Sequence, residues 1–555
     1  MHSQKCPRIL NMKVLALLGF LSLVITFITV RYAGDQQSGV ENDFLVHRSG
    51  HVKGVINMRR QNARPSHYMC KDGQEMDTRP LLSVPRVGKY CNIPNSEPPG
   101  EEGMVSKDYK LLAAHVVIRH GDRAPLIHLP NEKAPPLSCL VDMSQFKHVP
   151  KMQNYQHVMA QAAQTTENDS DSVAEFRRWA MYPSRTECGE GQLTGRGATQ
   201  QILSGLHLHQ RYAQSPHNLS LNLNTVVAHT TVVSRTYQSA VAFLYGLLTD
   251  FNPKKLRLHG ASSIMFCDSN AAPGSVCSCP GLEAFRNRAI SKCKSDSHVF
   301  QSLARYEETA AKTVAQVLGV PDVKLPTPEG VMDALSRYAC HSIPPPCVTT
   351  TTNTSDGVCS SVTCINAKTM EAVWAPVDAM SSCISSNPDY RKYSAASTQG
   401  LLLRIVQGLH RATLRRKNNE KNTGTENGSD TSQKHEPVFV LYSGHDNTLT
   451  PLIAALGLTD TVWPGYATRL VFELYRRKWS SSGKAQHFVR VLLNGKPVTY
   501  ETVFCKAGSV LSGANDLCEF ERFQAHIVGM KVQSFCSSLR FVSNSLNRRR
   551  KRAQK

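Results

Sequence analysis

A chain of 555 residues, 41% of them hydrophobic, is long enough to bury a substantial core and to form more than one domain. Its net charge of +21 favours acidic partners, which are nucleic acid, an anionic membrane or anionic glycans. The compartment in which the chain folds decides among these three classes.

The first predicted element is an uncharged apolar run, 14–30, at the short end of what crosses a bilayer. Basic residues precede the run and acidic residues soon follow it, which predicts a cytosolic tail, 1–13, and a lumenal body. A cleaved signal peptide is the alternative, but Arg31 occupies a position where cleavage requires a small residue. We therefore expect an uncleaved signal anchor and a single-pass type II membrane protein.

Cysteines and glycosylation sequons support a lumenal body. Of the 17 cysteines, Cys6 falls on the cytosolic tail, and the remaining even number suits disulfides in an oxidising compartment, although the sequence does not give their pairing. A zinc site at Cys267, Cys277 and Cys279 is the alternative, but no paired C-x-x-C motif supports it. Lumenal placement excludes nucleic acid as the acidic partner and leaves anionic glycans and the membrane. Sequons begin at Asn168, Asn218, Asn353 and Asn427.

The lumenal part divides by composition. Residues 31 to about 88 are polar and lack periodicity, and the segment 97–103 (EPPGEEG) is a further linker signal. Together they predict a stem, 31–105. A globular domain, 106–540, follows. The last segment, 541–555, contains RRRKR and is predicted to be a basic, disordered, solvated tail, with contact to anionic glycans as the alternative.

The globular domain opens with short apolar runs that are typical of strands buried on both faces. Helical patterns follow the second run, at 236–248, and the third run, at 447–458. Alternating strands and helices predict an α/β domain. The runs are 111–118, 224–233 and 437–443.

Two further strands are predicted near the C-terminus, at 469–475 and 487–493. Asn494-Gly495 then favours a tight turn into KPVTY, which adds antiparallel edge strands to a mixed sheet.

The connections within the globular domain are long. Between Arg235 and His445 lie 209 residues, which is more than a compact domain holds as loop. We expect a mainly helical cap, inserted at about 140–220 and 255–400. Residues 416–435 are polar and of low complexity, which predicts a mobile surface loop.

Charged residues follow the buried strands at the point where each strand ends. The carboxyl ends of strands in an open α/β sheet meet at one crevice, so these residues are expected to converge although they are far apart in sequence. Three arginines and two histidines around one point suit a phosphoryl dianion, whose oxygens match the planar fork of arginine. The residues are Arg119, His120, Arg123, Arg235, His445 and Asp446.

Their chemistry predicts a phosphohistidine mechanism without a metal or other cofactor. A neutral His120 imidazole can attack phosphorus, and the neighbouring arginines keep it unprotonated. The same arginines neutralise the equatorial oxygens in the transition state, so no metal is required. Asp446 can protonate the leaving alkoxide and then activate water.

Four motifs resemble those of the histidine acid phosphatases. RHGDRAP (119–125) matches the RHGxRxP signature, SRT (234–236) resembles the third phosphate-binding arginine, GHD (444–446) resembles the His-Asp pair, and GQLTGRGATQ (191–200) resembles G-x-L-T-x-x-G. The resemblance implies a mixed-sheet α/β sandwich of the histidine phosphatase type with an inserted, mainly helical cap. It also implies that His120 is the nucleophile, that Arg119, Arg123, Arg235 and His445 bind phosphate, and that Asp446 is the proton donor.

Further segments look like one branch of that family, whose Golgi type II membrane enzymes act on 2-phosphoxylose in the linkage region of proteoglycans. The segments include YCNIP (90–94) and VRVLLNG (489–495). This resemblance implies phosphorylated xylose as substrate, Golgi glycosyltransferases or a kinase as possible partners, and anionic glycans at the basic surface. The long stem, the polar loop and the basic tail depart from the pattern.

Three alternatives remain open at this point. The first is a broad lumenal acid phosphatase, and the second is an inositol-polyphosphate phosphatase, although that group tends to carry His-Ala-Glu at the position of His445-Asp446. The third is a non-catalytic glycosaminoglycan-binding protein. We interpret His115 as a core residue, Asp122 as a residue that orients the loop, and Thr194 as the N-cap of a helix.

Overall fold

The structure is a computed structural model, and the residues that it describes belong to one compact unit, Ser66–Lys555. The expected anchor 14–30 and tail 541–555 lie outside the described residues, as do Cys6 and the sequons at Asn168 and Asn427. No helix among the described residues is both long and apolar enough to cross a bilayer. The described residues are 67–69, 77–95, 98–164, 176, 179–214, 216–267, 279, 281–354, 357–421, 437–458, 462–478, 486–505, 516–530 and 532.

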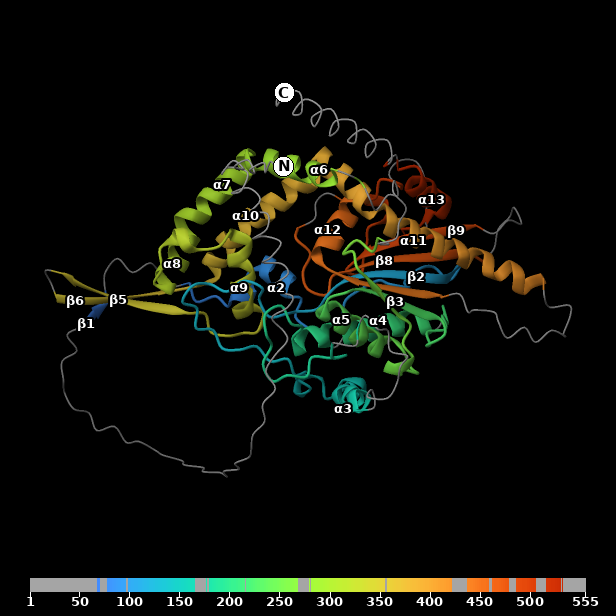
Figure 1. The fold of residues 1–555 in the computed structure, drawn as a ribbon, viewed down its shortest axis with the longest axis horizontal. Coiled ribbons are helices and arrows are strands. Elements are labelled where there is room, and N and C mark those ends of the chain that lie inside the picture. The colour runs from blue at the N-terminus through green and yellow to red at the C-terminus, as the bar shows by residue number, and fades with distance from the viewer. Residues whose placement is uncertain are drawn as a thin grey trace, which may run out of the picture. The chain divides into compact units, whose positions relative to one another are not determined.

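Eight strands form one mixed sheet in the order β10-β9-β8-β2-β7-β3-β4, with β11 paired to β9 (Figure 1). The parallel strands are β2, β7, β3 and β4, and the other four run antiparallel to their neighbours. The expected mixed sheet is therefore present. The strands are β2 (Tyr109–Arg119), β3 (Val226–Thr231), β4 (Leu258–Ala261), β7 (Phe439–Gly444), β8 (Arg469–Arg477), β9 (His487–Leu493), β10 (Lys496–Pro497) and β11 (Cys518–Glu519).

Helices cover both faces of this sheet because the central strand β2 is apolar on both sides. Val116 packs into the core on one face and Val117 into the core on the other. On the first face α4 and α5 pack so closely that a Cβ on Gly205 would lie 2.1 Å from the carbonyl oxygen of Phe243. The first face carries α3 (Pro150–Gln164), α4 (Gly195–Ala213) and α5 (Ser234–Leu247), and the second carries α11 (Pro388–Lys421), α12 (Asp446–Ala455) and α13 (Phe520–Val528).

The expected cap range 255–400 also includes β4 of the main sheet and the start of α11. The helices between β4 and α11, apart from α6 (Leu282–Lys294), build a separate core around the buried Trp374. A π-helical turn, η6 (Tyr306–Ala311), joins two of them, and the hairpin β5–β6 carries β1 on its edge. The helices are α6 (Leu282–Lys294), α7 (Ser297–Arg305), α8 (Lys312–Leu318), α9 (Pro328–Cys340) and α10 (Ala367–Ser386); the small strands are β1 (His67–Met69), β5 (Cys347–Thr354) and β6 (Gly357–Cys364); the short 3-10 turns are Leu81–Ser83, Ser144–Phe146, Pro253–Lys255, Asp322–Lys324 and Thr499–Glu501.

The prediction of a stem is wrong for its C-terminal part, because that part belongs to the globular unit. Residues 85–91 form the helix α2 (Pro85–Cys91), whose Val87 and Tyr90 are buried in the cap core. Glu102, within the predicted linker 97–103, is fully buried and its carboxylate lies 2.6 Å from the Arg469 guanidinium. Folded structure thus begins well before the expected boundary at residue 106.

Two other expectations need correction. α4 falls inside the expected cap insertion 140–220, yet it shares the sheet core with α5 and belongs to the main layer. The expected loop 416–435 begins as helix, because α11 continues to Lys421; residues 422–435 lie outside the described residues.

Disulfides connect segments that are distant in sequence, in keeping with the expectation of an oxidised body. Cys267 and Cys279 are both disulfide-bonded, which removes them from the alternative zinc site, and Cys277 lies outside the described residues. The bond between Cys91 and Cys340 joins α2 to α9 across 249 positions. The other pairs that can be described are Cys139–Cys188, Cys293–Cys383, Cys347–Cys364 and Cys505–Cys518.

Candidate active site

The pairing register of the parallel strands brings together the charged residues that follow their C-terminal ends. Arg119, the last residue of β2, pairs with Gly444 of the parallel strand β7, so the next residues, His120 and His445, lie side by side. Their ring centroids are 5.7 Å apart. Arg235 lies in the first turn of α5, shortly after the end of β3, and its charge acts on both imidazoles.

His120 is buried and has a defined tautomer. Its Nδ1 lies 2.8 Å from the carbonyl oxygen of Gly121, and because a carbonyl only accepts, Nδ1 carries the proton. Nε2 therefore keeps its lone pair. Burial, followed by the charges of Arg235 and Arg119, lowers the pKa of His120 well below its ordinary value, so the ring is neutral around pH 7. A neutral imidazole with an available Nε2 is a nucleophile.

Arg119 is completely buried between two aromatic rings. Its guanidinium carbon lies 4.4 Å from the ring centre of Tyr466 and 5.1 Å from that of Tyr90. One terminal nitrogen donates to the carbonyl of Pro464 at 2.6 Å, and the other lies 3.0 Å from Oδ2 of Asp446. Its buried Nε–H has no acceptor among the described residues, so an anion bound there would supply one.

Arg123 is held from the cap by a buried carboxylate. Its terminal nitrogens lie 2.8 and 3.3 Å from the two oxygens of Asp333, on α9. The same carboxylate accepts the backbone N–H groups of Leu126 and Ile127, so it fixes the loop as well as the guanidinium. The cap therefore contributes directly to the orientation of a predicted phosphate-binding residue.

Replacing Asp333 by asparagine is expected to lower the free energy of unfolding by about 3 kcal/mol, because a buried Arg123 charge loses its partner. Inorganic phosphate should then raise the melting temperature of the variant more than that of the wild type, since the bound dianion replaces the missing counter-charge. Thermal unfolding with and without phosphate measures both effects. Asp322→Asn, at an exposed position, is the control, and equal phosphate effects in Asp333→Asn and wild type would contradict this role.

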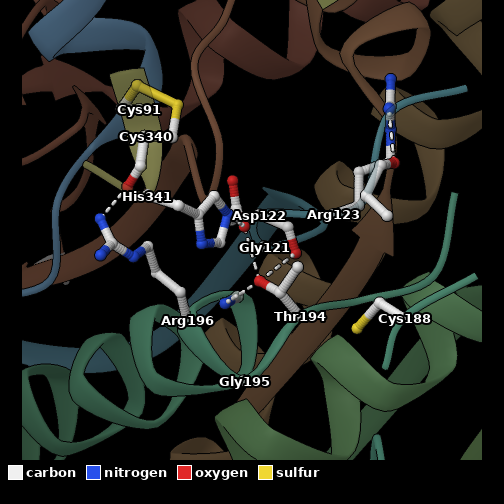
Figure 2. Close-up of polar contacts among 12 residues, drawn as sticks. Cys91, Gly121, Asp122, Arg123, Cys188, Thr194, Gly195, Arg196, Cys340 and His341 are labelled. Atoms are coloured by element: carbon white, nitrogen blue, oxygen red, sulfur yellow. Dashed lines mark hydrogen bonds and ion pairs between the residues drawn. A yellow bond between two sulfur atoms is a disulfide. The ribbon is translucent and has the colours of Figure 1, made fainter. Parts of the chain in front are cut away.

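Asp122 orients the loop between Gly121 and Arg123 (Figure 2). Its Oδ2 accepts hydrogen bonds from the Thr194 hydroxyl at 2.6 Å and from Nε2 of His341 at 2.7 Å. Burial alone would raise the pKa of Asp122, but the charge and hydrogen bond of His341 lower it below its ordinary value. The carboxylate thus ties the loop both to the start of α4 and to the end of α9.

The G-x-L-T-x-x-G stretch packs against this loop for a steric reason. Thr194 is the N-cap of α4, and its side chain accepts the N–H of Gly197. A Cβ on Gly197 would lie 2.1 Å from the carbonyl oxygen of Asp122, so only glycine allows the helix to approach so closely. The next turn is tied to the cap, because Arg196 donates to the carbonyl of Cys340 (Figure 2).

Asp446 begins α12 and faces several donors. Oδ1 accepts the N–H of Asn447 at 2.7 Å, and Oδ2 accepts Nε1–H of Trp463 at 3.2 Å in addition to its contact with Arg119. Burial would raise its pKa, but the charges of Arg119 and then Arg123 lower the pKa below its ordinary value. Asp446 is therefore ionised in the structure.

His445 is oriented by a threonine on the neighbouring strand. Its Nε2 lies 2.9 Å from the hydroxyl oxygen of Thr231, which also contacts the hydroxyl of Thr236. Burial and then the charge of Arg235 lower the pKa of His445, so this ring is neutral as well. Two neutral imidazoles leave the positive charge of the site on its arginines.

One buried histidine and one cavity lie away from the predicted phosphate site. His115 is buried further back on β2 and packs against Tyr442, where burial lowers its pKa to about 3. A cavity of about 930 Å³ lies beside the C-terminal half of α4 and is lined by residues such as Lys151 and Arg211, none of which belongs to the predicted site.

Several residues at the site were not predicted from the sequence: Tyr90, Thr231, Asp333, Trp463 and Tyr466. The Trp-Pro-Gly-Tyr stretch carried a usable signal, because aromatic residues flank a turn directly before a predicted strand. That strand runs antiparallel to β2, so its beginning lies at the edge where β2 ends. Asp333 had no such signal, because it lies on an ordinary cap helix.

A neutral histidine facing buried arginines at the carboxyl ends of parallel strands defines a histidine-dependent phosphatase. Residues 110–354 and 386–494 match the family model of the histidine phosphatase superfamily, branch 2. The chain belongs to this superfamily and is a phosphoric monoester hydrolase.

The chain is similar to two vertebrate enzymes. It is 31% identical over 452 residues to 2-phosphoxylose phosphatase 1 of Danio rerio, an alignment that covers 79% of this chain and 82% of the relative. It is 29% identical over 421 residues to 2-phosphoxylose phosphatase 1 of Homo sapiens, covering 75% and 77%. Among solved structures, Hafnia alvei phytase in complex with myo-inositol hexakis sulphate matches 77% of this chain and 98% of its own length, with 16% identity and a TM-score of 0.40.

Proposed function

We propose that the protein hydrolyses the 2-O-phosphate of xylose in the glycosaminoglycan–protein linkage region during proteoglycan biosynthesis. The observation that carries the proposal is the likeness, over 77–82% of their length, to the two enzymes named 2-phosphoxylose phosphatase 1. A broad-specificity lumenal acid phosphatase is the second candidate, because the residues around His120 recognise a phosphoryl group whatever alcohol carries it.

In the first step, Nε2 of His120 attacks phosphorus in line and the bond from phosphorus to the ester oxygen breaks. The guanidinium groups of Arg119, Arg123 and Arg235 neutralise the equatorial oxygens as charge develops on them. His445, whose Nε2 lies beside the Thr231 hydroxyl, borders the phosphate site next to the His120 ring. Asp446 gives its proton to the departing alkoxide, so the sugar leaves as an alcohol.

In the second step, water attacks the phosphohistidine. Asp446, now a carboxylate, takes a proton from the water as the new oxygen–phosphorus bond forms and the bond from phosphorus to Nε2 breaks. His120 returns to its neutral state because Gly121 still holds the proton on Nδ1. Inorganic phosphate leaves, and Asp446 releases the proton to solvent as its contact with Arg119 is restored.

The substrate itself explains how an ionised Asp446 becomes an acid. At rest the contact with Arg119 keeps its pKa low. A bound phosphate dianion competes for Arg119 and places negative charge beside the carboxylate, and both changes raise the pKa of Asp446. Protonation of Asp446 is therefore coupled to substrate binding.

The pH dependence should follow from these two groups. His120 has a lowered pKa, so its neutral form persists into mild acid and the nucleophile is not lost there. Above the pKa that Asp446 has in the substrate complex, kcat for an alkyl phosphate should fall about tenfold per pH unit, because the proton donor is lost. Initial rates from pH 4 to 9 test this expectation, and a rate that climbs steadily above pH 8 would contradict it.

Release of phosphate from a phosphorylated linkage tetrasaccharide by the purified protein tests the substrate. We expect kcat/KM for the tetrasaccharide to exceed that for phytate and for simple alkyl phosphates. If the protein hydrolyses generic monoesters but leaves the tetrasaccharide intact, the second candidate replaces the first. Preferential release from phytate would instead point to an inositol-polyphosphate phosphatase.

The cellular placement is also part of this proposal: a single-pass type II Golgi membrane protein with anchor 14–30, a lumenal stem and a lumenal catalytic domain. The disulfides between Cys91 and Cys340 and at other sites support an oxidising compartment. In that setting the basic surface would meet anionic glycans, and linkage-region glycosyltransferases or a kinase would be neighbours. Protease protection of the intact chain in sealed Golgi vesicles would test the orientation.

A further inference from the structure

The segment Trp463–Thr468 wraps the catalytic dipeptide at the end of β2. The N–H of Arg119 donates to the carbonyl of Thr468 at 2.9 Å, and the N–H of Ala467 donates to the carbonyl of His120 at 3.1 Å. These two backbone bonds fix the segment against the residues expected to bind and attack phosphorus.

The same segment is fixed on its other side by the cap. The N–H of Tyr466 donates to the carbonyl of Tyr90, and Arg86 donates to the carbonyl of Trp463 at 3.0 Å. A Cβ on Gly465 would lie 2.5 Å from the carbonyl oxygen of Lys89, so glycine permits this close approach. Trp463 therefore extends from a backbone that has little freedom to move.

The indole of Trp463 lies beside the predicted proton donor. Its Nε1–H donates to Oδ2 of Asp446 at 3.2 Å. The side chain packs against the cap core on one side but is only partly buried. A leaving oxygen must come within hydrogen-bonding reach of the Asp446 carboxyl to receive its proton. The group that carries this oxygen is therefore placed next to the indole.

We infer that Trp463 forms the leaving-group side of the site, where its N–H positions Asp446 and its ring receives the apolar C–H face of the sugar that carries the phosphate. This inference rests on the proposed function and adds the residue that recognises the sugar. An indole suits both tasks, because it combines a large flat apolar face with one hydrogen-bond donor. Trp463 is thus a specificity-determining residue that also acts as a positioning residue through Asp446.

Two substitutions separate the tasks. Trp463→Phe keeps an aromatic face but removes the N–H, and Trp463→Leu removes both. The substrates are methyl β-xyloside 2-phosphate, which has a sugar ring, glycerol 2-phosphate, which is an alkyl ester without one, and p-nitrophenyl phosphate, whose leaving group needs no proton. Phe300→Leu, which removes an exposed aromatic ring from α7, is the matched control.

We expect Trp463→Leu to raise KM for the xyloside phosphate about tenfold and to leave KM for glycerol 2-phosphate within twofold. Trp463→Phe should keep KM for both substrates within threefold of the wild type. Trp463→Phe removes a hydrogen-bond donor that favours the ionised form of Asp446, so the pKa of Asp446 should rise. The alkaline limb of the pH profile of kcat should therefore move to higher pH for both alkyl esters. The rate with p-nitrophenyl phosphate should change least, which also shows that the variants are folded.

Equal rises in KM for the xyloside phosphate and glycerol 2-phosphate in Trp463→Leu would overturn sugar recognition by the indole. An unshifted alkaline limb in Trp463→Phe would overturn its positioning of Asp446. Failure of the proposed function has a different signature, which is a wild-type enzyme that does not prefer the xyloside phosphate to glycerol 2-phosphate. In that case the pH profile with glycerol 2-phosphate still decides the role of the N–H.

Discussion

Replacing His120 by alanine is expected to abolish phosphatase activity, with a loss of about 10⁴-fold or more in kcat, because no covalent intermediate can form without the imidazole. His120 is buried, neutral and held with Nε2 unprotonated. Arg119 cannot replace it as nucleophile because its guanidinium stays charged, and His445 cannot because its ring is held in another orientation by Thr231. Release of p-nitrophenolate and of phosphate from the linkage tetrasaccharide measures the loss. Alanine removes a ring without adding a charge, so the fold should be retained.

His410→Ala, which removes an exposed histidine from α11, is the matched control and should keep wild-type rates. Brief incubation with a radiolabelled monoester, followed by quenching, should trap an acid-labile phosphoryl group on the wild type and on His410→Ala but not on His120→Ala. The same variants decide whether the protein acts only as a glycosaminoglycan-binding scaffold. If His120→Ala retains the effect of the protein in cells, catalysis is not its function there.

The central sheet and the convergence of the site could be predicted from the sequence because they rest on local patterns. Apolar runs such as 111–118 are bounded by charged residues, and parallel strands end at the same edge of a sheet, so Arg119, His120 and His445 had to meet if the runs were neighbours. The structure places β2 and β7 in register with Arg119 opposite Gly444. The hydrophobic periodicity of the two segments does not by itself determine that register.

The cap contacts could not be predicted because no local pattern carries them. Asp333 reaches Arg123 across 210 positions, and α9 has the amphipathic pattern of any packed helix. The helix α2 has seven residues, too few for a convincing helical period, so Tyr90 was assigned to a stem although its hydroxyl lies 3.3 Å from Arg119. Contacts of this kind depend on how the cap is placed on the sheet.

Converting Asp446 to asparagine is expected to slow hydrolysis of alkyl phosphates by about 10²- to 10⁴-fold, because the amide can neither protonate the leaving oxygen nor activate water. Phosphorylation of His120 by p-nitrophenyl phosphate should stay fast, because the p-nitrophenolate leaving group needs no proton. Hydrolysis of the phosphohistidine should become slow. Stopped-flow absorbance should therefore show a burst of p-nitrophenolate close to one equivalent of enzyme, followed by a slow phase.

The same substitution also tests the electrostatic argument. In the wild type Asp446 occupies a terminal nitrogen of Arg119 that a phosphate dianion would otherwise use, and its own charge repels that dianion. Asp446→Asn should therefore bind inorganic phosphate more tightly, with a lower inhibition constant, even as turnover falls. Asp322→Asn, an exposed acid outside the site, should change neither quantity. Weaker phosphate binding would show that Asp446 holds Arg119 in its binding position, and wild-type turnover of alkyl phosphates would remove Asp446 from proton transfer.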